Sequence, residues 1–255
     1  MLHTKNARAA SPFKRYAVSL ARHADDIREA QKLRWLVFAQ EFGAELQSPE
    51  PGLDIDKFDA HCEHLIVRDR LFNRVVGTYR LLTARAARQA GGYYSEQEFD
   101  LGGLTERRPN ILEMGRSCVH PESRGGPIVT LLWAGLGEFL AADPHDTLIG
   151  CASIPLTDGG HHAASVYAEA ARNHLAAPEF RVSPRRPLPL AGLDASRDPS
   201  PPPLIRGYLR SGAVICGAPA YDPDFNTADL FMMLQLERIE LRHTRYLKQP
   251  LPKVA

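Results

Sequence analysis

The order of strand-type and helix-type patterns constrains the fold of this chain more than any other feature of its sequence. The chain begins with a strand-type pattern and a helix-type pattern, which are followed by a predicted β-hairpin. A strand, a helix, a second strand and a second helix come next, and short strands end the series. A sheet built from such connections is mixed and carries helices on its faces. We therefore predict one α/β domain over residues 1–255, with a mixed central β-sheet flanked by helices. The expected strands are Lys14–Ala21, His64–Arg68, Arg74–Thr83, Ile111–Val119, Thr147–Ile154, Ala213–Gly217 and Asp229–Leu236, and the expected helices are Ala24–Phe42, a segment after Arg124-Gly-Gly-Pro, a segment around Val166–Ala171, and Leu204–Arg210.

Composition is that of an ordinary globular enzyme. The 255 residues are 44% hydrophobic and 24% charged, which is enough apolar material for one sizeable core. A formal net charge of +1 gives no bias toward nucleic acid. Four widely spaced cysteines indicate buried thiols, so we predict no metal site. The longest apolar run, Leu131–Ala142, is too short to span a bilayer, and we expect a cytoplasmic protein, with peripheral contact at the inner membrane face left open.

Charged residues gather in two segments. Acidic residues predominate between Glu41 and Glu63, and arginines predominate between Arg172 and Arg210. Each segment is interpreted either as a solvated surface or as a surface that binds a partner. The arginine-rich segment includes residues 178–203, where eight prolines predict an irregular excursion.

The strand Ile111–Val119 carries two charged residues of particular interest, Glu113 and Arg116. Their odd spacing places them on opposite faces of a regular strand. Gly115, which lies between them, is typical of a bulge that shifts the side-chain register and leaves a backbone N–H group free to polarise a carbonyl. Two interpretations stay open, because the two charges can serve a reaction or can satisfy each other or other core charges.

A second set of charges is expected to form a buried cluster. Arg80 shares a strand face with apolar residues, and Arg34 falls beside the apolar stripe of the first helix. Both arginines need carboxylate partners, which Asp56 and Asp59 in the acidic segment can supply. We predict a structural salt cluster of these four residues. A binding role for the same carboxylates remains open, since they would attract a cationic substrate.

The turn Arg124-Gly125-Gly126-Pro127 precedes a helical pattern. Flexible backbone at a helix N-terminus can present N–H groups to a phosphate. The turn is therefore interpreted either as a phosphate-binding loop or as a geometric connection.

Several motifs that occur together resemble one known family. They are Arg34-x-x-Val-Phe-x-x-Glu41, Asp54-Ile-Asp-Lys-Phe-Asp59, Val75-Val-Gly-Thr-Tyr-Arg-Leu-Leu82, Glu113-Met-Gly-Arg-Ser-Cys-Val-His120, Gly150-Cys-Ala-Ser153, Pro203-Leu-Ile-Arg-Gly-Tyr-Leu-Arg210 and Asp224-Phe-Asn-Thr-Ala-Asp229. Together they resemble the GNAT-superfamily ornithine N-acyltransferases of ornithine-lipid synthesis and, more distantly, the acyl-homoserine-lactone synthases. The resemblance covers nearly the whole chain and implies a GNAT-like domain over residues 1–255, with 178–203 as a Pro-rich insertion.

The resemblance also implies the substrates. The donor is a (3-hydroxy) fatty acyl group on the phosphopantetheine of acyl carrier protein, and the acceptor is the α-amine of an amino acid, with ornithine favoured. The phosphopantetheine arm is expected between the strand ending near His120 and the strand around Gly150, with Arg124, Gly125 and Gly126 as phosphate-binding residues. The turn departs from the usual coenzyme A loop, which favours a carrier protein that brings no adenosine phosphates. No permanently bound cofactor is expected, and the arginines between 172 and 210 are expected to meet the acidic carrier protein.

In the expected mechanism Glu113 is the general base for the acceptor ammonium, directly or through water. Backbone N–H groups of Gly115, Arg116 and Ser117 hold the developing oxyanion, and Tyr167 is the acid for the leaving thiolate. Three alternatives stay open: acyl-homoserine-lactone synthesis, N-acylation of another amino acid, and a non-catalytic module that binds acyl carrier protein or a membrane surface.

Overall fold

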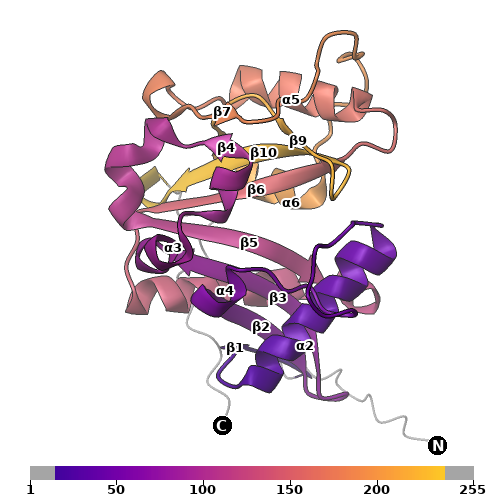
Figure 1. Ribbon diagram of the computed structural model, residues 1–255, viewed down its shortest axis with the longest axis vertical. Coiled ribbons are helices and arrows are strands. Elements are labelled where there is room, and N and C mark those ends of the chain that lie inside the picture. Colours follow the sequence, from indigo (N-terminus) through magenta and orange to yellow (C-terminus); the bar gives the residue numbers. More distant parts are fainter. Residues whose placement is uncertain (1–14, 239–255) are drawn as a thin grey trace, which may run out of the picture.

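The structure is a computed structural model that describes residues 15–238 (Figure 1). Its strands are β1 (Tyr16–Leu20), β2 (Glu63–Asp69), β3 (Arg74–Thr83), β4 (Phe99–Asp100), β5 (Ile111–Val119), β6 (Thr147–Pro155), β7 (Ser183–Pro184), β8 (Val214–Ile215), β9 (Ala220–Asp222) and β10 (Thr227–Gln235). Its α-helices are α2 (Ala24–Trp35), α3 (Ala84–Ala90), α4 (Ile128–Ala142), α5 (His161–Asn173) and α6 (Pro203–Arg210). A π-helical segment (Leu36–Glu41) continues α2, and 3-10 turns cover Asp59–His61, Tyr94–Gln97, Gly102–Asn110, Pro121–Ser123, Pro178–Phe180 and Leu236–Arg238.

The central sheet is mixed, as the sequence predicts. Its strand order is β1-β2-β3-β5-β6-β10-β8, and β9 also pairs with β10. β5 and β6 are parallel, and the other neighbouring strands of this sheet are antiparallel. The helix α4 connects β5 to β6, which is the crossover that a parallel pair requires. The expected hairpin of β2 and β3 is also confirmed.

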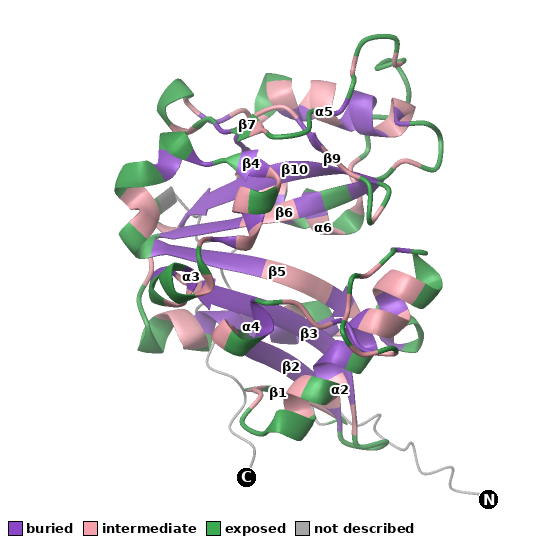
Figure 2. Cartoon of the chain, in the orientation of Figure 1, coloured by how far each residue is buried: buried purple, intermediate pink, exposed green. Residues whose placement is uncertain are grey.

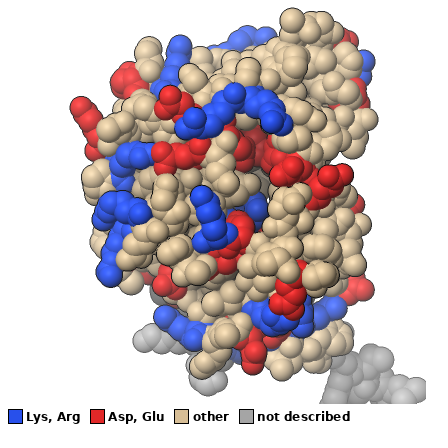
Figure 3. All heavy atoms as spheres, in the orientation of Figure 1, with Lys and Arg blue, Asp and Glu red and all other residues tan. Residues whose placement is uncertain are grey.

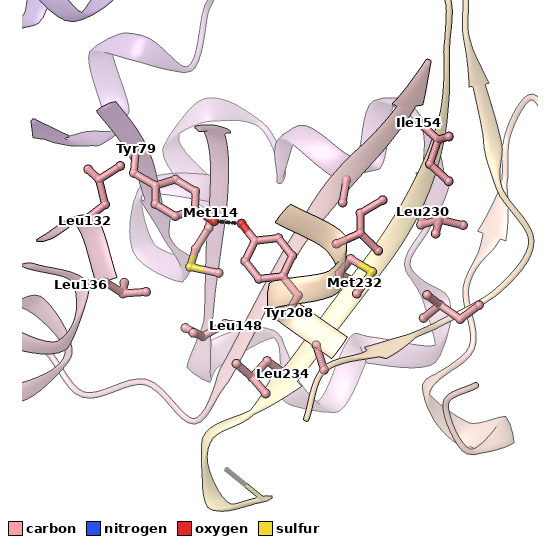
Figure 4. Packing of buried hydrophobic residues seen from close by; sticks show 14 of the residues in the cluster. Tyr79, Met114, Leu132, Leu136, Leu148, Ile154, Tyr208, Leu230, Met232 and Leu234 are labelled. Atoms are coloured by element: carbon pink, nitrogen blue, oxygen red, sulfur yellow. Dashed lines mark hydrogen bonds between the residues drawn. The ribbon is translucent and has the colours of Figure 1, made fainter. Parts of the chain in front are cut away.

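The two faces of the sheet carry different layers, because successive side chains of a strand point to opposite sides. The larger core lies under α4, α5 and α6, and Figure 4 shows part of it. α2 and α3 cover the other face, where α2 crosses β2 and β3 in Figure 1. Figure 2 shows the central strands buried along much of their length, whereas the helices expose one side. The first core includes Leu81, Leu112, Leu148, Leu132 and Val166, and the second face includes Leu82, Ile111, Ile149, Ala30 and Ala87.

Some segments differ from the sequence prediction. The pattern over Ala24–Phe42 is α-helical only to Trp35 and then becomes π-helical. Residues 178–203 are largely irregular, as expected, but they also contain a 3-10 turn and the short strand β7, which pairs with β4. Lys14, the expected start of the first strand, lies outside the described residues. Within residues 15–238 no helix is long and apolar enough to cross a membrane.

Candidate active site

The strands β5 and β6 separate partway along their length and open a cavity between them. They pair only from Ile111 to Glu113 on β5, opposite Thr147 to Ile149 on β6. Gly150 follows immediately, and a Cβ atom there would lie 2.3 Å from the carbonyl oxygen of Met114. A side chain at position 150 would therefore clash with the β5 backbone at the point where the strands part.

The cavity has a volume of about 440 Å³. Its walls come from β3, β5, β6, β10, the π-helical segment, the turn after Tyr93, and α6. The lining residues that matter below are Phe38, Tyr79, Arg80, Tyr94, Glu113, Met114, Gly115, Arg116, Ser117, Cys151, Leu204, Tyr208, Asp222 and Asp229. Pockets of this size and mixed character are the usual sites of small-molecule binding.

A β-bulge in β5 brings Arg116 to the face that carries Glu113. The pairing of β3 with β5 shifts between Thr78 and Arg80, which pair with Cys118 and Gly115. Arg116 adopts a left-handed conformation with φ of 52°, so the left-handed residue of this bulge is Arg116, whereas Gly115 was the residue expected to break the pattern. The shift gives Glu113 and Arg116 a place in the same cavity despite their odd spacing.

Glu113 is 3% exposed and both of its carboxylate oxygens accept hydrogen bonds. The backbone N–H of Tyr94 donates to Oε2 at 2.6 Å, and the backbone N–H of Ser95 donates to Oε1 at 2.8 Å. The hydroxyl of Ser95 also donates to Oε1. Burial raises the pKa of Glu113, although these donors favour the charged form and oppose that rise.

The four residues predicted as a salt cluster lie together, with Arg34 on α2 and Arg80 on β3. Arg34 donates to Asp59 through Nη2 at 2.8 Å, and Arg80 donates to Asp56 at 2.7 Å and to Asp59 at 3.2 Å. Arg34 also donates to Asp54 through Nε at 2.7 Å.

Arg116 joins this cluster from the cavity side. Its guanidinium contacts Asp54 at 3.1 Å and Asp56 at 3.5 Å, and it lies 4.8 Å from the ring centre of Tyr94. Both a pairing of Arg116 with Glu113 and a pairing with other core charges were open from the sequence, because the side to which a bulge turns a residue is not visible in the sequence pattern.

A second hollow of about 610 Å³ adjoins the cavity and shares Tyr94, Arg116, Asp222 and Phe225 with it. Its lining mixes acidic and basic side chains, and Figure 3 shows both kinds gathered on this face of the molecule. The acidic members are Glu45, Asp54, Asp56, Glu98, Asp222 and Asp224, and the basic members are Lys57, Arg116, Arg185 and Arg186.

Sequence reasoning missed a carboxyl-rich group at the wall between the two hollows. Glu98, Cys151 and Asp229 place one ligand atom each within 4.8 Å of one another, which makes them the candidate cation site of the described residues. Burial, together with the nearby Asp229 and Asp222, raises the pKa of Glu98 to about 9. The three residues are far apart in the sequence, so no local motif could have indicated them.

Two tyrosines meet inside the cavity. The hydroxyls of Tyr79 on β3 and Tyr208 on α6 are hydrogen-bonded to each other, next to Met114 (Figure 4). Burial raises the pKa of Tyr208 to about 12, so its hydroxyl holds a proton at neutral pH. The structure does not bring the predicted acid Tyr167 to this cavity, because that residue lies on α5 and packs against the larger core.

The predicted phosphate loop lies at the start of α4. Gly125 has φ of 75°, a conformation that favours glycine. Arg124 forms a two-point ion pair with Glu41, with contacts of 2.5 and 2.6 Å, and its guanidinium lies 5.7 Å from the ring centre of Phe42. Glu41 and Phe42 line the cavity, whereas Arg124, Gly125 and Gly126 do not. The loop therefore adjoins the cavity entrance without forming its wall.

The fold and its split strands define the class of protein. The family described as Acetyltransferase (GNAT) domain matches residues 33–134. Among solved structures, the acyl-homoserine-lactone synthase LasI has a TM-score of 0.53 at 14% identity and covers 91% of this chain and 94% of its own. The CoA-dependent acyl-homoserine-lactone synthase MesI also has a TM-score of 0.53 at 14% identity, covering 90% and 93%. The chain has a GNAT acyltransferase fold.

Curated relatives identify the particular family. The L-ornithine N(alpha)-acyltransferase of Brucella abortus (strain 2308) is 37% identical over 246 residues, which cover 90% of this chain and 87% of that protein. The protein of the same name from Rhizobium meliloti (strain 1021) is 36% identical over 249 residues, covering 89% and 82%. The chain belongs to the L-ornithine N(alpha)-acyltransferase family, as its motifs predict. The acyl-homoserine-lactone synthases share its fold at far lower identity, so that alternative fits less well.

Proposed function

We propose that this chain is a single N-acyltransferase domain that transfers a fatty acyl group from acyl carrier protein to the α-amine of ornithine. The observation that carries the proposal is the cavity between β5 and β6, where Glu113 and the bulge at Arg116 flank a space open to an acyl donor. The family relationship supports ornithine as acceptor.

The donor thioester is proposed to enter between the diverging strands. The apolar side chains of Met114 and Leu204 offer contacts for a hydrocarbon chain in the cavity. The arginines of residues 172–210 are exposed, and two of them, Arg185 and Arg186, line the second hollow. An acidic carrier protein would be steered by such a surface.

The proposed reaction forms one amide bond and breaks one thioester bond. Glu113 takes a proton from the acceptor ammonium, directly or through water, and the neutral amine then attacks the thioester carbonyl carbon. Backbone N–H groups at the bulge, from Gly115 to Ser117, hold the oxyanion. When the C–S bond breaks, the leaving thiolate takes a proton. We assign that proton to Tyr208, which lines the cavity, in place of Tyr167. The nitrogen loses its second proton as the amide forms, and this proton restores Tyr208 through solvent. The products are therefore the amide, the free thiol and the one proton taken up by Glu113.

The experiment compares donors at fixed ornithine. Purified protein is given a long-chain 3-hydroxyacyl carrier protein or acetyl-CoA, and release of the free thiol is followed. The proposal predicts far faster turnover of the carrier-protein donor. Equal or faster turnover of acetyl-CoA would refute the donor assignment, and stable binding of the carrier protein without any thiol release would support a binding module instead.

A further inference from the structure

The carboxyl group of Glu98 is buried beside that of Asp229 in an arrangement without a cationic partner. Glu98 follows the 3-10 turn Tyr94–Gln97, Cys151 lies on β6, and Asp229 lies on β10, where it pairs with Ser153 of β6. Asp229 is 4% exposed and still lines the main cavity. Cys151 also lines the main cavity, whereas Glu98 lines the second hollow. Three separate elements thus bring two carboxyl groups and a thiol to one point of the wall between the two hollows.

The missing partner distinguishes this pair from the other buried carboxylates of the site. Asp54, Asp56 and Asp59 contact arginines, and Glu113 accepts three hydrogen bonds. By contrast, the Asp229 carboxyl and the Cys151 thiol face the carboxyl oxygens of Glu98, and neither of these buried oxygens has a hydrogen-bond partner of good geometry among the described residues. The hydroxyl of Thr227 donates to Asp229 at 2.7 Å. Among the residues that the structure describes, no arginine, lysine or histidine forms an ion pair with either member.

Such a pair is costly unless a proton or a cation is present. Two ionised carboxylates whose oxygens lie within 4.8 Å of each other repel each other, and burial removes the hydration of each. Asp222, which lines both hollows, adds a third negative group, and Cys151 and the Glu98 carboxyl face each other. Burial and the neighbouring carboxyl groups raise the pKa of both Glu98 and Asp229, so the free protein meets this cost by holding a proton on the pair. An entering ammonium can replace that proton.

We infer that Glu98 and Asp229, with Asp222 beside them, bind the distal ammonium of a diamino-acid acceptor. This inference rests on the proposed function and names the part of the cavity that selects its acceptor. A substrate with two amines needs one site that removes a proton and another that keeps the second amine charged. The carboxyl pair supplies the second site.

The position of the pair relative to Glu113 supports this assignment. The hydroxyl of Ser95 donates to Glu113 and accepts a hydrogen bond from the Cys151 thiol at 3.4 Å. Two side chains, those of Ser95 and Cys151, therefore link the two carboxyl sites. An acceptor whose amines are joined by a short methylene chain can reach both, with its α-amine toward Glu113 and its distal ammonium toward Glu98 and Asp229.

The test compares ornithine with norvaline, which has the same carbon skeleton but lacks the distal amine. Binding of each to the full-length protein is measured by isothermal titration calorimetry for the parent, Glu98→Gln and Asp229→Asn. Asp224→Asn is the matched control, because Asp224 is an exposed acid of the same hollow. Melting curves establish that each variant is folded.

The parent should bind ornithine at least about tenfold more tightly than norvaline, and both site variants should lose most of that preference while the control keeps it. Equal binding of the two amino acids by the parent would overturn the inference. So would a preference that survives in both folded site variants. Tight stoichiometric binding of Zn²⁺ that excludes ornithine would overturn it in favour of a metal site.

Acyl transfer to each amino acid keeps this result separate from the proposed function. If the parent acylates ornithine and norvaline with equal kcat/KM, the carboxyl pair is not the selective site, although the acyltransferase assignment stands. If the parent prefers ornithine in binding but transfers no acyl group to it, the binding site stands and the proposed reaction fails.

Discussion

Replacement of Arg80 by alanine tests whether the buried charge cluster holds the fold together. Arg80 is 3% exposed, and its guanidinium contacts Asp56 at 2.7 Å and Asp59 at 3.2 Å. Without it, Asp59 retains Arg34, and Asp56 retains the 3.5 Å contact with Arg116 and the hydrogen bond from the backbone N–H of Phe58 at 2.8 Å. Because both carboxylates keep some of their partners, the free energy of unfolding should fall by about 3 kcal/mol, the lower end of the range for a broken buried ion pair.

Urea denaturation measures this loss. For a chain of this size, about 3 kcal/mol corresponds to a midpoint shift of about 1 M in urea. Arg28→Ala is the control, because Arg28 and Glu50 form an ion pair whose side chains are 47% and 45% exposed. Its removal should leave the urea midpoint close to that of the parent, since exposed ion pairs contribute little to stability. Equal midpoints for Arg80→Ala and Arg28→Ala would refute the structural role of Arg80. An unchanged midpoint with abolished activity would make Arg80 a substrate contact.

The pH dependence of this loss has a definite sign. Burial raises the pKa of Asp56, but Arg80 and Arg116 outweigh that effect and hold it below the ordinary 3.8. The stability that this contributes is present above pH 3.8 and is lost as pH falls through the folded-state pKa. The difference between parent and Arg80→Ala should therefore shrink in acid.

Three further predictions follow from the site. Gly150→Ala should lower the melting temperature and the activity, since its Cβ would clash with the β5 backbone, whereas Gly115→Ala has free space and should melt like the parent; equal melting of all three proteins would contradict this. The pKa of Glu98 is raised to about 9 in the folded protein, so the parent should lose stability as pH rises from about 5 to 9. Glu98→Gln cannot ionise there, and its stability relative to the parent should rise by at most about 1.4 kcal/mol per pH unit over this range. A stability difference that does not depend on pH would contradict this prediction. Glu113→Gln should lower single-turnover acyl transfer by about 10²- to 10⁴-fold, with a residual rate that rises with pH as free amine becomes available; a variant that is destabilised but has the parent's pH profile would make Glu113 structural.

Local patterns predicted much of the fold. The alternation in β2, β3 and β5 and the apolar stripe of α4 depend on neighbours in the sequence, and all four elements formed where expected. The charge cluster could also be anticipated, because a buried arginine needs a carboxylate wherever that carboxylate lies in the chain.

The parts that could not be predicted depend on how distant segments meet. The direction in which the bulge turns the Arg116 side chain is set by the pairing of β5 with β3. The carboxyl pair brings together residues 98 and 229, which are far apart in the sequence. Tyr208 reaches the cavity because its helix, α6, brings its hydroxyl to that of Tyr79. Tyr167 lies on another helix, α5, and packs against the larger core. No spacing in the sequence encodes these differences.

The central claim is that the chain acylates the α-amine of ornithine. The most direct test is tandem mass spectrometry of the product formed by the purified protein from an acyl carrier protein thioester and ornithine. The account predicts one acyl group, attached through an amide at the α-nitrogen, with the distal amine unmodified. An acyl group on the distal nitrogen, or no acylated ornithine despite a folded protein and an intact donor, would contradict it.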